Sequence, residues 1–205
     1  MNRTRIALLV ATLTVAVPAL SQAIGKPGSP NPALVSAGVY KVDANHTQVL
    51  WTIDHLGITP LSGAFGASAG SLEIDPAKPA SAKVTVSFNI ADISTTAASF
   101  TRHLLSPDLF DAAKYPTASF TSTAVVANGP RAKVTGNLTL RGVTKPVVLD
   151  MMFYGAGINP RSKILGVGFS GTTTIKRSDF GLSYGLPNVG DEVKLQIVGA
   201  FDKVG

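Results

Sequence analysis

Alternation of apolar and polar residues marks three strongly patterned segments, Val49–His55, Val84–Ile90 and Val193–Phe201. In the first, residues 49, 51 and 53 are apolar, whereas Thr52 and Asp54 are polar. The other two segments repeat this two-residue period. Such a period is typical of a β-strand with one buried and one hydrated face. The sequence therefore predicts an amphipathic strand in each segment.

Weaker alternation extends the strand count to about eight. Candidate strands cover residues 65–74, 118–126, 132–140, 146–154 and 164–175, and turn signals such as Asn128-Gly129-Pro130 and Asn159-Pro160 separate some of them. Only residues 96–106 and 107–114 favour helix, the second with Ser106 as N-cap and Pro107 at the first helical position. The pattern predicts an all-β chain with one or two short helices in a loop.

Antiparallel strands joined by short turns can stack as a sandwich or close into a barrel, which removes unpaired edges. Periodicity does not choose between these folds. Small residues in the strands either mark bulges and corners or leave room for an internal cavity. These residues are Gly63, Gly66, Ala67, Gly70, Gly166, Gly168 and Gly171.

The N-terminus has the organisation of a secretory signal. Arg3 and Arg5 precede an apolar run over residues 6–20, and Ser21-Gln22-Ala23 supplies small residues at a cleavage site. We expect a signal peptide over 1–23, a flexible leader over 24–38 that sustains neither helix nor sheet, and one β-domain over 39–205. The expected product is periplasmic, without stable membrane insertion.

Composition narrows the classes of function. The net charge of +6 falls to +4 once the two arginines leave with the signal peptide, and the remaining basic residues are scattered, which does not indicate a nucleic-acid partner. With no cysteine in the sequence, packing rather than disulfides must hold the core.

Catalytic signatures are absent from the sequence. His46, His55 and His103 lack the close spacing of a zinc motif, and no Gly-x-Ser-x-Gly phrase occurs. The phrase Gly155-Ala156-Gly157 is shorter than a dinucleotide-binding loop and is better interpreted as a turn. We expect no enzyme activity, no metal and no cofactor.

Several ordered phrases together resemble the YceI family of lipocalin-like, polyisoprenoid-binding periplasmic proteins. They occupy residues 40–43, 46–49, 55–57, 63–65, 102–106, 110–111, 115–120, 136–146 and 177–182. Thr47 stands where the family usually has Ser and keeps the hydroxyl. Residues 95–99 are small, whereas the family often has charged residues here. The resemblance therefore does not define the shape of this mouth of the barrel.

The resemblance implies an extended antiparallel eight-stranded lipocalin-like barrel that holds a long isoprenoid or a similar amphiphile, such as a polyprenyl, quinone-like or fatty-amide lipid. Transport, a role in stress response, and a membrane electron-transfer or lipid-biosynthesis partner are compatible with the family. A homodimer is permitted but not required. The alternative is a protein-interaction module whose barrel is filled by side chains.

The candidate ligand-binding residues are those on the apolar face of the predicted strands. The predicted lining comprises Val49, Trp51, Ile53, His55, Val84, Val86, Phe88, Leu138, Leu140, Leu149, Phe153, Val193, Leu195 and Ile197. Candidate contacts for a lipid head group are His46, Arg102, His103 and Arg177, because Arg and His donate to anionic groups. Phe65, Phe110, Phe120 and Phe180 are interpreted as plugs or outer packing, since each lies beside a turn or short helix.

Overall fold

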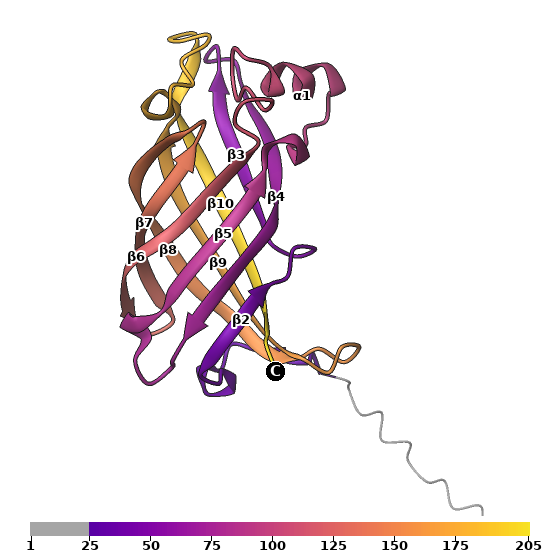
Figure 1. Cartoon of the computed structure of the whole chain (residues 1–205), viewed down its shortest axis with the longest axis vertical. Coiled ribbons are helices and arrows are strands. Elements are labelled where there is room, and N and C mark those ends of the chain that lie inside the picture. Colours follow the sequence, from indigo (N-terminus) through magenta and orange to yellow (C-terminus); the bar gives the residue numbers. More distant parts are fainter. Residues whose placement is uncertain (1–24) are drawn as a thin grey trace, which may run out of the picture.

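Eight long strands coil around one axis in the computed structural model, which describes residues 25–205 (Figure 1). They are β3 (Gln48–His55), β4 (Thr59–Ile74), β5 (Lys83–Asn89), β6 (Thr117–Asn128), β7 (Arg131–Leu140), β8 (Val143–Ile158), β9 (Leu165–Lys176) and β10 (Val189–Lys203). Every strand predicted from the periodicity is present. The predicted signal peptide lies outside the described residues.

Each strand from β3 to β10 pairs antiparallel with the next along the chain, and β10 pairs back with β3 from Val189↔His55 to Val198↔Gln48. The sheet is thus a closed eight-stranded antiparallel barrel, as expected. Every strand from β3 to β10 therefore has a neighbour on each side, and closure removes the edge strands that an open sheet would have. Within residues 25–205, no helix is long and apolar enough to cross a membrane.

One position in the barrel wall is filled by two strands in succession. The short strand β2 (Gly38–Val42) pairs with β10 and β4 toward the C-terminal end of β10, and β3 takes over the same neighbours further along. Figure 1 shows β2 and β3 at opposite ends of the barrel. At the break, the Thr47 hydroxyl donates to the Ala200 carbonyl and accepts from the Ala200 N–H, each over 2.9 Å. This side chain replaces backbone pairing that the break interrupts.

The one α-helix among residues 25–205, α1 (Ala98–Leu105), lies across one end of the barrel (Figure 1). Its last turn carries Arg102 and His103, whose charge or polarity suits a helix C-terminus. The second predicted helix, over residues 107–114, is wrong: this segment forms consecutive turns. Asp111 has a φ of 48°, and the Ser106 carbonyl accepts from the Asp111 N–H, so the chain curls back and cannot continue as a helix.

The N-terminal leader also differs from expectation. Strand β1 (Gly28–Ser29) pairs with Gly157 and Ala156 of β8, and a 3-10 turn follows over Pro32–Leu34. A Cβ on Gly157 would lie 2.3 Å from the Pro27 carbonyl oxygen, so the pairing depends on that glycine. Three further 3-10 turns cover Pro79–Ser81, Ile90–Asp92 and Arg177–Phe180.

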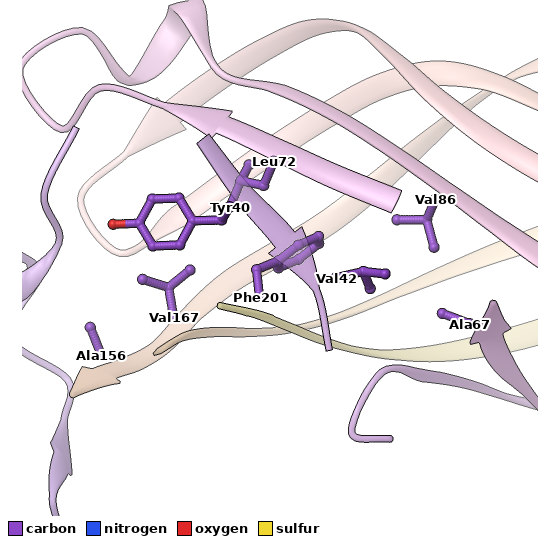
Figure 2. Packing of buried hydrophobic residues seen from close by; sticks show 8 residues of the cluster. All are labelled: Tyr40, Val42, Ala67, Leu72, Val86, Ala156, Val167 and Phe201. Atoms are coloured by element: carbon purple, nitrogen blue, oxygen red, sulfur yellow. The ribbon is translucent and has the colours of Figure 1, made fainter. Parts of the chain in front are cut away.

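A buried cluster fills the barrel end where β2 and the end of β10 meet (Figure 2). Its centre is Tyr40, which is fully buried and donates from its hydroxyl to the Ser36 carbonyl over 2.7 Å. The other members are Val42, Ala67, Leu72, Val86, Ala156, Val167 and Phe201. Two more clusters occupy the opposite half, around Phe180 and around Trp51. Between these clusters the barrel is hollow.

Candidate functional site: an apolar cavity inside the barrel

Two adjoining cavities occupy the barrel interior. The narrow cavity measures about 340 Å³ and extends toward the end that holds the Tyr40 cluster. The wide cavity measures about 720 Å³ and lies under α1. Both volumes fall in the usual range for ligand sites, roughly 300–1,000 Å³. The interior is therefore not filled by side chains, contrary to the alternative expectation of a filled barrel.

Four side chains belong to both walls: Val49 of β3, Phe88 of β5, Leu138 of β7 and Leu195 of β10. We refer to these four residues as the waist. They come from strands spread around the barrel, so the two cavities meet across its interior. A flexible chain that passed the waist would contact both compartments.

The walls contain every residue predicted to face the interior. Val49, Trp51, Ile53, His55, Phe88, Leu138, Leu140, Val193 and Leu195 line the wide cavity, and Val49, Val84, Val86, Phe88, Leu138, Leu149, Phe153, Leu195 and Ile197 line the narrow one. Strand pleating places residues of one parity on one face, so the two-residue period was sufficient to find them. Contact of these residues with a ligand stays a prediction.

Other wall residues were missed or misassigned. Phe65 and Phe110, interpreted from the sequence as plugs or outer packing, form part of the wide wall and pack edge to face with ring centroids 5.6 Å apart. Phe120 lines the narrow cavity, whereas Phe180 is buried outside both walls. Met151 lines the narrow cavity and shares the parity of Leu149 and Phe153, a signal present in the sequence.

Some strand glycines make room for large side chains of neighbouring strands rather than enlarging the cavity. A Cβ on Gly63 would lie 2.4 Å from the Trp51 ring, and a Cβ on Gly171 would lie 2.2 Å from the Met151 sulfur. The space released by each glycine is therefore taken by a side chain from the adjacent strand. Gly66, in contrast, has open space on the side where a Cβ would project.

Two of the four candidate head-group residues lie outside the cavity walls. His46 is 72 % exposed and pairs with Asp43 at the turn between β2 and β3. Arg102 is exposed on the outer side of α1. His103 does line the wide cavity, and its ring packs edge to face with Tyr184 at 5.1 Å. The structure thus keeps only His103 and Arg177 of this group beside the interior.

Arg177 lines the wide cavity but is already engaged by the backbone. Its guanidinium donates to the carbonyls of Leu182, Tyr184, Val189 and Gly190 over 2.5–2.9 Å. These bonds use four of the five N–H groups of an arginine. Burial lowers the pKa of Arg177, and Asp191 opposes this shift. The side chain therefore holds the loop between β9 and β10, and the prediction of Arg177 as a head-group contact is not favoured.

Asp191 completes this loop anchor. Its carboxylate accepts from the backbone N–H and the hydroxyl of Ser178, over 2.9 Å and 2.8 Å. Partial burial acts to raise the pKa of Asp191, but these two hydrogen bonds and the charges of Arg177 and Lys176 outweigh it, so the pKa is lowered.

A closed antiparallel barrel with an apolar, two-compartment interior defines a lipocalin-like architecture suited to binding. The chain belongs to the YceI family, since the model of the YceI-like domain matches residues 40–201. A UPF0312 protein of Pseudomonas aeruginosa strain LESB58 is 40 % identical over 161 residues, which cover 78 % of this chain and 84 % of the relative. A UPF0312 protein of Pseudomonas savastanoi pv. phaseolicola is 40 % identical over 158 residues, covering 73 % and 82 %.

Solved structures share the fold. BcnA of Burkholderia cenocepacia superposes with a TM-score of 0.67 at 28 % identity, covering 78 % of this chain and 98 % of BcnA. The YCEI protein of Campylobacter jejuni gives 0.63 at 31 % identity, covering 74 % and 90 %. A polyisoprenoid binding domain from Saccharophagus degradans, implicated in plant cell wall breakdown, gives 0.61 at 15 % identity and covers 80 % and 98 %. That last likeness bears on the fold alone.

Proposed function

We propose that this protein binds a long-chain isoprenoid or a similar amphiphilic lipid inside the barrel and carries or sequesters it in the periplasm. The observation that carries the proposal is the pair of adjoining apolar cavities, which share the four waist residues in their walls. Family membership supports it, and so does the polyisoprenoid binding domain that shares the fold. A polyprenyl, a quinone-like molecule and a fatty amide each have the required shape.

Apolar area is sufficient as a source of affinity. Each methylene removed from water contributes roughly 0.8 kcal/mol, so a chain of about ten buried carbons gains about 8 kcal/mol before the costs of ordering are subtracted. The walls supply mainly aliphatic and aromatic contacts for such a chain. No covalent step is needed, which agrees with a binding protein rather than an enzyme.

The test is mass spectrometry of an organic extract from the purified native protein, with denatured and refolded protein as the blank. We expect a long-chain lipid in stoichiometric amount in the native sample only. If the native extract is empty and the protein also fails to take up added polyprenol, the proposal is wrong.

A pair of variants links the ligand to the interior. Trp51→Glu places a carboxylate in the wide cavity, whereas Lys194→Glu places one on the exposed outer face of β10. Only Trp51→Glu should abolish recovery of the lipid, because a buried unpaired charge is costly. Circular dichroism of both variants separates loss of binding from loss of fold. Equal loss in two folded variants would contradict an interior site.

A further inference from the structure

The loops beside the wide cavity expose large apolar side chains to solvent. Ile58 is 80 % exposed and Leu56 is 50 % exposed, both in the turn between β3 and β4. Tyr184, in the loop between β9 and β10, is 53 % exposed and also belongs to the cavity wall. We name Leu56, Ile58 and Tyr184 the apolar rim.

Hydrogen bonds fix the two loops of the apolar rim to each other. The Leu56 N–H donates to the Asn188 carbonyl over 2.9 Å, which connects the β3–β4 turn to the β9–β10 loop. The Asp54 carboxylate accepts from the Gly57 N–H over 2.9 Å and closes the turn. The backbone that carries these exposed side chains is therefore held in place at one end of the barrel.

The exposed side chains of Leu56 and Ile58 contribute little to folding, and Leu56 also has a conformational cost. Leu56 has a φ of 64°, in the left-handed region that a leucine rarely adopts. An exposed isoleucine gains nothing from burial, and a glycine or asparagine would suit this turn better. Strained and solvent-exposed apolar residues together point to a role in binding something outside the chain.

The position of the apolar rim identifies the partner. Pro60, Thr96, Ala97 and Tyr184 are exposed residues of the wide-cavity wall, so they mark its mouth, and the rim flanks that mouth. A lipid that crosses water to reach the cavity exposes its methylenes on the way. Each exposed methylene lowers the equilibrium population of that exposed state about fourfold. Direct contact between the mouth and a bilayer removes that penalty.

We infer that the apolar rim inserts into the interfacial region of a lipid bilayer, so that the wide mouth opens onto the membrane and lipid passes directly between bilayer and cavity. Amphipathic aromatic and aliphatic side chains are suited to that depth. This inference rests on the proposed function, because it gives the route by which the proposed ligand enters.

Flotation with vesicles of phosphatidylcholine containing one-fifth phosphatidylglycerol tests the docking. Ile58→Asp alters the apolar rim. Ile158→Asp is the control: Ile158 is 52 % exposed at the end of β8, near the C-terminal end of β10 and so at the other end of the barrel from the rim. We expect Ile58→Asp to reduce the vesicle-bound fraction about tenfold or more, and Ile158→Asp to leave it unchanged. The milder Ile58→Ser serves if the aspartate variant does not fold.

Two outcomes would overturn the docking. One is equal vesicle binding by wild type, Ile58→Asp and Ile158→Asp. The other is complete loss of wild-type binding in 1 M salt, which would attribute the attraction to the net positive charge rather than to the apolar rim.

A second measurement separates this inference from the proposed function. Polyprenol is supplied either from dilute detergent or from vesicles, and its uptake is measured for the same proteins. We expect Ile58→Asp to take up polyprenol normally from detergent but severalfold more slowly from vesicles. Failure of all proteins to bind polyprenol from either source would refute the proposed function, whereas equal rates from vesicles would refute only the docking.

Discussion

The Thr47 hydroxyl provides a sharp test of how the barrel closes where β2 gives way to β3. Thr47 is only 5 % exposed, and its hydroxyl bonds both the N–H and the carbonyl of Ala200. Thr47→Val removes the hydroxyl while conserving the shape of the side chain. The Ala200 carbonyl keeps its bond from the Asp43 N–H, 2.8 Å away, but the Ala200 N–H loses its acceptor.

An unpaired buried donor costs about 1–3 kcal/mol, so Thr47→Val should lower the free energy of unfolding by that amount. For a chain of this size, each kcal/mol corresponds to roughly 2–4 °C in Tm. Thr47→Ser keeps the hydroxyl and loses one methyl group, so it should cost less than about 1 kcal/mol.

Urea unfolding provides the assay, since Trp51 is the only tryptophan in the sequence and is buried in the folded barrel. Its fluorescence reports the transition without a label. The reasoning is refuted if Thr47→Val is as stable as wild type, or if Thr47→Ser loses as much stability as Thr47→Val. In either case the hydroxyl would not be what stabilises the break.

Three further predictions follow from contacts inside and at the ends of the barrel. Gly63→Ala should cost about 1–3 kcal/mol in urea unfolding, because a Cβ there meets the indole ring and a backbone oxygen, whereas Gly66→Ala on the same strand should cost little. Arg177→Lys should lower stability by about 2 kcal/mol or more in the same assay, because an ammonium cannot bond all four carbonyls; unchanged stability would count against the loop anchor. Burial and the neighbouring Asp43 raise the pKa of Asp202, so its ionised form destabilises the folded state above that pKa. Asp202→Asn should therefore raise Tm at pH 7 and make no difference near pH 2.5, where the carboxyl is protonated in both states; a lower Tm at pH 7 would contradict this sign.

The sequence predicted well which strand residues face the barrel interior, because the alternation of side chains along a strand depends only on local geometry. In β3, β5, β7, β8 and β10, a pleated strand sends alternate residues to one face, and the apolar face is the one that turns inward. Strand β9 was harder, because Gly166, Gly168 and Gly171 interrupt its apolar pattern. Its contribution to the narrow cavity, through Phe169 and Thr173, was missed.

Contacts between distant segments were not predictable in the same way. The leader residues Gly28 and Ser29 form a strand only because Gly157 and Ala156 of β8 offer a backbone partner. Nothing near residue 28 in the sequence carries that information. The volume of the interior was equally hard to predict from the sequence, because the space beside a strand glycine such as Gly63 is taken by a neighbouring ring.

Arg177 shows why head-group chemistry is harder to predict than a lining. An arginine bonds an anionic head group and a set of backbone carbonyls through the same N–H groups, so residue type does not distinguish the two roles. Here the backbone carbonyls within residues 182–190 accept four hydrogen bonds from Arg177, so its role is to hold this loop. If the proposed lipid places its head group in the wide cavity, we expect its polar contacts to come from other wall residues, among which are His55, His103 and Tyr184. Imidazole and phenol groups both form hydrogen bonds with oxygen, so these three side chains suit an oxygen-bearing head group.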